Sequence, residues 1–263
     1  MEVHTHSSPA PGGAHTPRKK WTHYFWEFLM LFFAVFCGFL AENFREQQVE
    51  HHREKQYMES LIEDLASDTA SLTSTSIRAN ALEKGFDSLK NFLYDIENVE
   101  KNTPIIYRQN ATYTRNVLLS LNDQTAIQLR NSGAMRLIRN RDVANAIARY
   151  WKNSIILENT INNFNAFIAE KAKSEDIIFN RKFYKMIVMV DSSTTNSWAR
   201  LSSYSDNAAA HLMTTDNNLL ISYANYTDRL QKFIENYIIP QANRLRSNAV
   251  KLIYLIKKEY HFE

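Results

Sequence analysis

The sequence predicts an all-α fold, in which an N-terminal transmembrane helix runs into an elongated up-down-up bundle of three long helices plus short helices. Turn residues are scarce, since the only glycines and prolines beyond residue 41 are Gly85, Gly133, Pro104 and Pro240. A β-sheet protein of 263 residues would need many more of them in its turns. Apolar residues also recur at three- and four-residue steps over three long stretches, the periodicity of amphipathic helices and coiled coils.

The N-terminal residues 1–20 are predicted to be a disordered cytoplasmic tail. They contain three of the five prolines and two of the five glycines, with almost no large apolar side chain. Such a composition buries too little apolar surface to fold. His4, His6 and His15 have the chemistry to bind a transition metal, but no scaffold fixes their geometry, so no metal site is predicted here.

Residues 21–41 are predicted to form a transmembrane helix. An uncharged run of fourteen residues begins at Phe28, and the four residues before it extend the stretch to eighteen. Eighteen helical residues measure about 27 Å, close to a hydrocarbon core of about 30 Å. No small-x-small cleavage site follows and apolar residues occupy every face, which favours a retained anchor over a cleaved signal peptide or a buried core helix. Aromatic residues that favour the headgroup layer stand at its start: Trp21, Tyr24 and Trp26.

Small side chains line one face of this helix, at the spacing i, i+3, i+4 and i+7 that lets two helix backbones approach closely. These residues are Ala34, Cys37, Gly38 and Ala41. Glu27 lies seven residues before Ala34 and therefore falls on the same face. Three interpretations of Glu27 stay open: it reaches the headgroups beside His23 one turn earlier, it joins a helix–helix contact, or it belongs to a proton or ion pathway. The face predicts a homo-oligomer that forms through the transmembrane helix.

Charge predicts the orientation. Arg18, Lys19 and Lys20 precede the apolar segment, whereas Arg45 is the only Lys or Arg in the ten residues after it. The positive-inside rule then places the N-terminus in the cytoplasm and residues 42–263 in the periplasm, for a single-pass protein of a bacterial inner membrane. Residues 1–41 hold three of the 31 basic and two of the 28 acidic residues, which leaves 28 and 26 beyond. That near balance gives no long-range attraction to nucleic acid.

The first bundle helix is predicted over residues 42–98. No proline interrupts the chain from Phe25 to Ile96, so the anchor and this helix are expected to be continuous. Asp68 and Thr75 occupy two positions of its apolar register. The apolar residues of that register are Tyr57, Leu61, Leu65, Leu72, Ala79, Leu82, Phe86, Leu89, Leu93 and Ile96.

A connection and a short helical segment are predicted next. Residues 99–122, which contain Pro104, are expected to be irregular. The short segment covers residues 123–139, with Gly133 in the left-handed conformation that often ends a helix. Its candidate N-caps are Asn122 and Asp123.

Two further long helices complete the predicted bundle. Asn140 is expected to cap the helix 141–186, with Asp142 in its first turn. A polar stretch separates it from the last helix, 216–260, which we expect to bend near Pro240. In an up-down-up order the third helix runs the same way as the first, so the C-terminus is expected far from the membrane.

Catalytic motifs are absent from the sequence. It has no GxSxG, P-loop, dinucleotide glycine fingerprint or HExxH motif, and no set of nucleophile, base and orienting group can be assembled. The single cysteine, Cys37, excludes an intrachain disulfide and a cysteine-based zinc site. We therefore predict a protein that is not an enzyme and that has no cofactor and no metal.

Two groups of residues are candidates for ligand binding. Four arginines lie within twelve residues around Gly133, where converging guanidinium groups beside free backbone N–H groups would bind a carboxylate or phosphate. The alternative is that they cap helix ends and pair with acids across the bundle. The four are Arg130, Arg136, Arg139 and Arg141. The second group, in the least regular segment, could line a pocket: Trp198, Arg200, Tyr204 and His211.

Three segments together resemble an uncharacterised family of bacterial single-pass membrane proteins, known mainly from Bacteroidetes as a domain of unknown function. They are "GFLAENFRE", "EKQYMESLIEDL" and "TAIQLRNSGAMRLIRNRDVANAIARYW". The resemblance covers about residues 20–152 and is most specific from Leu129 to Asn140. It implies the topology and a bacterial origin, and it supplies no mechanism.

The sequence thus predicts a non-enzymatic, membrane-anchored helical scaffold or interaction module of the bacterial cell envelope. Its expected partners are the lipid bilayer, further copies of itself and an unknown envelope protein, with no nucleic acid. The alternative is a sensory or ligand-binding bundle that recognises a small anion at the arginines and signals through a partner protein.

Overall fold

The computed structural model describes residues 21–113, 115–186 and 210–262. The chain divides into two compact units, with the boundary between Arg53 and Glu54. Almost every described residue is helical, and the one β-bridge among them joins Phe179 to Leu212. This confirms the all-α class. The predicted tail at residues 1–20 lies outside the described residues.

Helix α1 (Trp21–Tyr94) contains both the predicted anchor and the predicted first bundle helix. Its sequence has no proline, and within the second unit its buried residues follow the predicted register. Asp68 and Thr75 are buried there as well, at 2% and 3% exposure. Gly85 is required by packing, because a Cβ at this position would lie 1.9 Å from the ring of Tyr113.

The expectation of an irregular segment over residues 99–122 is wrong for its first part. After a 3₁₀ turn, η1 (Ile96–Asn98), helix α2 runs over Val99–Tyr113 with Pro104 inside it. Proline lacks an N–H, so it removes one bond near the start of α2 and leaves the rest of the helix intact. Residues 115–122 are not helical.

The α3–α4 region follows the sequence closely. Helix α3 (Gln124–Asn131) is followed by Gly133 at φ +67°, and by the 3₁₀ turn η2 (Ala134–Leu137). The side chain of Asn140 then accepts hydrogen bonds from the backbone N–H groups of the first turn of α4 (Arg141–Ile178). Helix α4 ends eight residues before the predicted Met186, and a 3₁₀ segment, η3 (Arg181–Met186), follows it.

The last part of the bundle comprises α5 (Asn217–Phe233), the π-helical turn η5 (Ile234–Ile238) and α6 (Ile239–Tyr260). Asp216 caps α5 by accepting from the N–H of Asn218 at 2.8 Å. The π turn lies directly before Pro240, whose missing N–H leaves a carbonyl without its usual i+4 donor.

The order of the long helices differs from the predicted up-down-up arrangement. Helix α4 runs parallel to α1, because contacts of α1 with Arg139 and then with α4 advance along both segments together: Arg139–Glu54, Tyr150–Asp68 and Phe164–Phe86. Helices α5 and α6 run antiparallel to α1, through the pairs Asn225–Tyr94, Asp228–Lys90, Arg246–Thr73 and Tyr260–Glu54. The reason is the returning segment α2 and 115–122, which carries the chain back along α1 before α4 begins.

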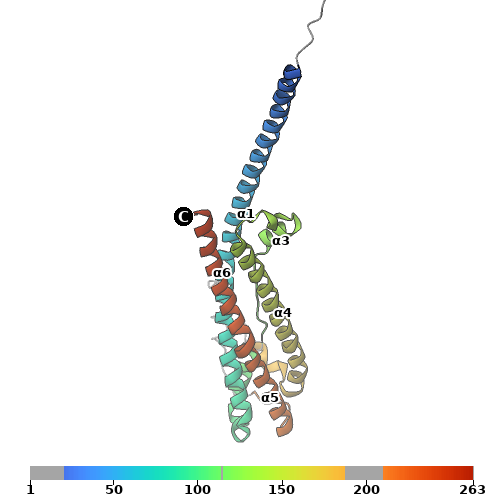
Figure 1. Cartoon of the computed structure of the whole chain (residues 1–263). Coiled ribbons are helices and arrows are strands. Elements are labelled where there is room, and N and C mark those ends of the chain that lie inside the picture. Colours follow the sequence, from blue (N-terminus) through green and yellow to red (C-terminus); the bar gives the residue numbers. More distant parts are fainter. Residues whose placement is uncertain (1–20, 114, 187–209, 263) are drawn as a thin grey trace, which may run out of the picture. The chain divides into compact units, whose positions relative to one another are not determined.

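The C-terminus also differs from expectation, because α6 ends beside the first residues of the second unit. The hydroxyl of Tyr260 donates to the Glu54 carboxylate at 2.5 Å, and the Lys55 ammonium lies 5.1 Å from the ring of Phe262. In Figure 1 the C-terminus lies at the same end of the bundle as α3. The prediction that the C-terminus lies at the opposite end of the bundle from the entry of α1 is therefore wrong.

Two apolar clusters form the interior of the second unit. The larger one packs α1 against α4 and α6 along most of the bundle. The smaller one joins the end of α1, α2, the end of α4 and the start of α5, and includes Tyr107, Phe179 and Tyr223. Burial of such side chains stabilises a fold by about 1.5–3 kcal/mol each.

Candidate functional site

The N-terminal part of α1 is long and apolar enough to cross a membrane by length and composition. An eighteen-residue window has a mean hydropathy of 1.9, and none of it is buried in the structure. Its aromatic side chains contact one another along the helix, as in the stack of Phe32 on Phe36 at 5.9 Å between ring centroids. His23 lies 3.1 Å from the carboxylate of Glu27, one turn away as the sequence predicted.

The predicted contact face lies on this exposed helix. Glu27, Ala34, Cys37, Gly38 and Ala41 are all exposed. A Cβ built at Gly38 meets nothing within 4 Å, so the described chain leaves room for another helix there.

The four predicted arginines have different surroundings, and all are exposed. Arg130 lies in the last turn of α3 and Arg136 in η2. The side chain of Arg139 lies 3.9 Å from the carboxylate of Glu54, and its backbone N–H donates to the same group at 2.9 Å. Arg141 is the first residue of α4.

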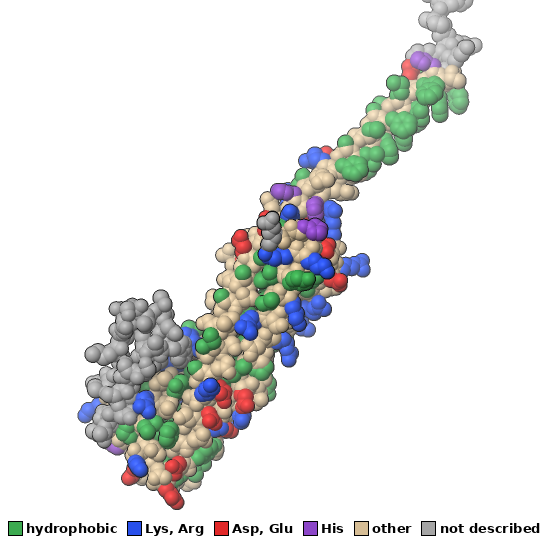
Figure 2. Space-filling view, turned by 90° about the vertical axis from the view of Figure 1, so that its left-hand side faces the viewer, with side chains coloured by type: hydrophobic (Ala, Val, Ile, Leu, Met, Phe, Trp, Pro, Cys, Tyr) green, Lys and Arg blue, Asp and Glu red, His purple; other side chains and the backbone are tan. Residues whose placement is uncertain are grey.

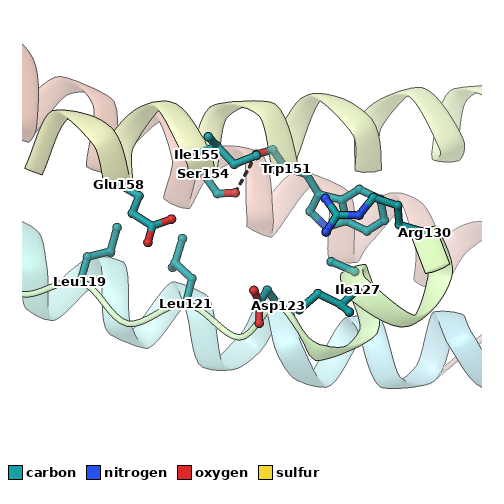
Figure 3. A pocket seen from close by; sticks show the side chains of 10 residues that line it. Leu119, Leu121, Asp123, Ile127, Arg130, Trp151, Ser154, Ile155 and Glu158 are labelled. Atoms are coloured by element: carbon teal, nitrogen blue, oxygen red, sulfur yellow. Dashed lines mark hydrogen bonds between the residues drawn. The ribbon is translucent and has the colours of Figure 1, made fainter. Parts of the chain in front are cut away.

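Arg130 lines a pocket of about 180 Å³ between the 119–130 segment and α4. Arg130 and Trp151 lie at one end of it, and Leu119 and Glu158 at the other (Figure 3). The other three arginines are not among its ten lining residues. Its walls are mostly apolar, and its charged groups are Arg130, Asp123 and Glu158, so the pocket carries more negative than positive charge. It is therefore a poor site for a small anion.

The second predicted pocket group falls mostly outside the described residues, which include none of Trp198, Arg200 and Tyr204. His211 is described, and its ring packs edge-on against Phe183 at 5.0 Å between centroids. It lines a hollow with Glu97 and Glu100 near the start of α2.

Two buried polar clusters were not predicted as sites. The first, which we call the aspartate cluster, consists of Asp64, Asp68, Asn122, Thr125 and Tyr150. Asp64 accepts from the Asn122 side chain at 2.6 Å and from the Thr125 backbone at 3.1 Å. Asp68 accepts from the Asn122 backbone at 2.7 Å and from the Tyr150 hydroxyl at 2.6 Å. Two carboxylates of α1 thus hold the start of α3 and one turn of α4.

Burial dominates the electrostatics of this cluster. It raises the pKa of Asp68, and the hydrogen bonds from Tyr150 and Asn122 oppose that rise. The pKa of Tyr150 is raised by burial and by its bond to Asp68, so its proton stays on the tyrosine.

The second group, the lysine cluster, consists of Lys171, Asn110, Glu175, Tyr184 and Tyr223. The fully buried Lys171 ammonium donates to Asn110 and Glu175 at 3.0 Å each, and to the Tyr223 hydroxyl. Asn110 in turn donates to the Tyr184 hydroxyl at 2.8 Å. The cluster joins α2, α4, η3 and α5 at the opposite end of the bundle from the aspartate cluster.

Burial lowers the pKa of Lys171 to about 8, although Glu175 favours its charged form. The pKa of Tyr223 is raised well above its usual value, first by burial and then by Glu175. Lys171 donates all three of these hydrogen bonds within the cluster, so we expect it to contribute to stability.

Metal binding has no candidate among the described residues, which contain no group of three or more His, Cys, Asp or Glu side chains placed for it.

Asp68 could have been singled out from the sequence, since it interrupts an apolar register. Lys171 gives no comparable signal, because it lies among other charged residues on α4.

Comparison with known proteins gives no further guide, because no family model, curated protein or solved structure matches this chain.

Proposed function

We propose that this protein is a non-enzymatic scaffold or interaction module, held in a bacterial inner membrane by the N-terminal part of α1. The carrying observation is the eighteen-residue apolar window of α1, none of which is buried. An apolar surface of this size is costly in water and favourable in lipid. The second unit adds a bundle in which the buried Asp68 and Lys171 are hydrogen-bonded to neighbouring helices.

The periplasmic orientation of the bundle belongs to the same proposal and rests on the basic residues that precede α1. Self-association is proposed through the exposed face that includes Gly38. An envelope protein is the proposed partner of the bundle.

Membrane fractionation tests the anchor. The full chain should stay in the membrane pellet in alkaline carbonate and dissolve only in detergent. A variant with Leu31→Asp, Val35→Asp and Phe39→Asp, which places charge along the apolar helix, should move to the soluble fraction. A wild-type chain that carbonate releases would overturn the anchor.

Two measurements test the proposed orientation and the proposed self-association. A reporter fused after Glu263 should be active only outside the cytoplasm, and cytoplasmic activity would reverse the orientation. Gly38→Leu should weaken self-association in a membrane dimerisation assay, whereas Val35→Leu, which places a leucine outside the small face, should not.

Anion recognition at the four predicted arginines is not part of this proposal. Arg130 shares its pocket with two carboxylates, and Arg139 lies beside Glu54.

A further inference from the structure

A separate hollow of about 320 Å³ lies between α4 and α6. Its polar lining consists of Arg149 and Asn153 from α4 and Asn248 and Lys251 from α6, besides Tyr150. Ala146, Leu252 and Leu255 form its apolar floor. No carboxylate belongs to the lining, in contrast to the pocket beside Arg130.

The four polar side chains of α4 and α6 have no hydrogen-bond or ion-pair partner among the described residues. Arg149 and Lys251 are exposed and charged, and the two asparagines are partly buried and offer amide N–H donors. The hydroxyl of Tyr150 is directed to the core, where it donates to Asp68 at 2.6 Å. The hollow therefore gathers two cations and two amide N–H donors, and no carboxylate in its lining neutralises them.

Basic residues are also frequent on α6, beside the hollow. Helix α6 carries five Lys or Arg residues and one acid, Glu259, in its 22 residues. Lys251 also lines a neighbouring hollow between α1 and α6, with Arg246, Thr69 and Thr73 and again without a carboxylate. In the space-filling view, Lys and Arg side chains are spread over the middle part of the bundle (Figure 2).

We propose that the hollow between α4 and α6 binds a phosphate-type oxyanion through Arg149, Lys251, Asn153 and Asn248. A guanidinium, an ammonium and two amides provide charge and directed donors from two helices, which is the chemistry that recognises a phosphate group. The group comes either from free phosphate or from a lipid headgroup. The site is independent of the anchor proposal, since it uses only residues of the second unit.

The test uses the full chain in uncharged detergent and measures binding of radiolabelled inorganic phosphate by equilibrium dialysis at constant ionic strength. Wild type should bind saturably. Arg149→Gln and Lys251→Gln should each weaken binding by about tenfold or more, as expected for loss of a charged hydrogen bond. Lys152→Gln and Arg244→Gln, which change exposed cations outside the lining, should change it by less than about twofold.

Asn153→Ala distinguishes a defined binding site from general electrostatic attraction, because it leaves the net charge of the protein unchanged. It should weaken phosphate binding several-fold while circular dichroism stays that of wild type. An equal response of all four cation variants, with no response to Asn153→Ala, would overturn the proposal.

A second arm identifies the source of the oxyanion. The full chain is placed in vesicles of phosphatidylcholine, with or without phosphatidylglycerol. If the anionic lipid displaces phosphate, a headgroup occupies the site, and if it does not, free phosphate is the ligand. Absence of saturable phosphate binding both in detergent and in phosphatidylcholine vesicles would refute the site.

Discussion

The aspartate cluster and the lysine cluster are both buried, both polar and at opposite ends of one bundle, yet their chemistry differs. In the aspartate cluster the charged groups are acceptors, and two of their four donors are backbone N–H groups of the returning chain. In the lysine cluster the fully buried charged group is a donor, and its acceptors, the Glu175 carboxylate among them, all belong to side chains. The first therefore constrains the path of the backbone, and the second is expected to make stability depend on pH in the alkaline range.

This difference explains the order of the helices. The bonds from Asn122 and Thr125 to α1 hold the end of the returning segment, so α4 starts at the same end of the bundle as α1. Hydrogen bonds between side chains alone, as at Lys171, would be compatible with several paths of the backbone. Hydrogen bonds from backbone N–H groups to buried carboxylates are compatible with few.

The largest effect is expected from Asp68→Ala. It leaves the Tyr150 hydroxyl and the Asn122 N–H without their acceptor, at about 1–3 kcal/mol each, so the free energy of unfolding should fall by about 4 kcal/mol. Urea unfolding of the full chain in detergent measures it. Glu63→Ala, at an exposed position of the same helix, should change it by less than about 0.5 kcal/mol. Similar losses in both variants would mean that the buried Asp68 contributes no more to stability than an exposed acid of the same helix.

The lysine cluster should respond to pH in the alkaline range. Lys171 has a pKa of about 8 in the fold against 10.5 in the unfolded chain, so the unfolded chain binds more protons between these values. Stability therefore rises with pH from about 8, by about 2–3 kcal/mol at pH 10. Above pH 10 the raised pKa values of the buried tyrosines act in the opposite direction, since the unfolded chain then loses protons first. Unfolding at several pH values between 8 and 10 should show the rise in wild type and a flat profile in Lys171→Met.

A smaller contrast is expected between two tyrosines. Tyr150→Phe removes a donor from buried Asp68 and should cost about 2 kcal/mol, with the pKa of Asp68 moving further up. Tyr223→Phe should cost about 1 kcal/mol, because Lys171 keeps two other acceptors. Urea unfolding gives the costs and NMR titration gives the pKa of Asp68. A larger cost at Tyr223 would reverse the ranking of the two clusters.

Effects no larger than that of Tyr223→Phe are expected at the N-caps of α4 and α5. Asn140→Ala and Asp216→Ala should each cost about 1 kcal/mol, because each removes an acceptor from a first-turn N–H. Asn140→Asp keeps the acceptor and should be nearly neutral. Thermal unfolding resolves these differences.

Local pattern was enough to predict the long helices, the left-handed Gly133 and the cap at Asn140, since these depend on neighbours in sequence. The path of the chain was not predictable in this way. Pro104 suggested an irregular connection, whereas it lies inside helix α2. The parallel course of α1 and α4 depends on hydrogen bonds between residues more than fifty positions apart.

The candidate site shows the same limit. The exposed apolar helix could be located from composition, but Arg149, Asn153, Asn248 and Lys251 look like ordinary solvated residues until two helices bring them together. Sequence proximity instead drew attention to Arg130, Arg136, Arg139 and Arg141, of which only Arg130 lines the pocket in Figure 3.

The bond between Tyr260 and Glu54 has a mechanical consequence. Because the second unit begins and ends at neighbouring positions, a force applied between its two ends would peel α6 from α1 one contact at a time, starting at this bond. Such unzipping needs less force than shearing all contacts at once. A partner that pulled on the C-terminus against the entry of α1 would therefore open the bundle from that end first.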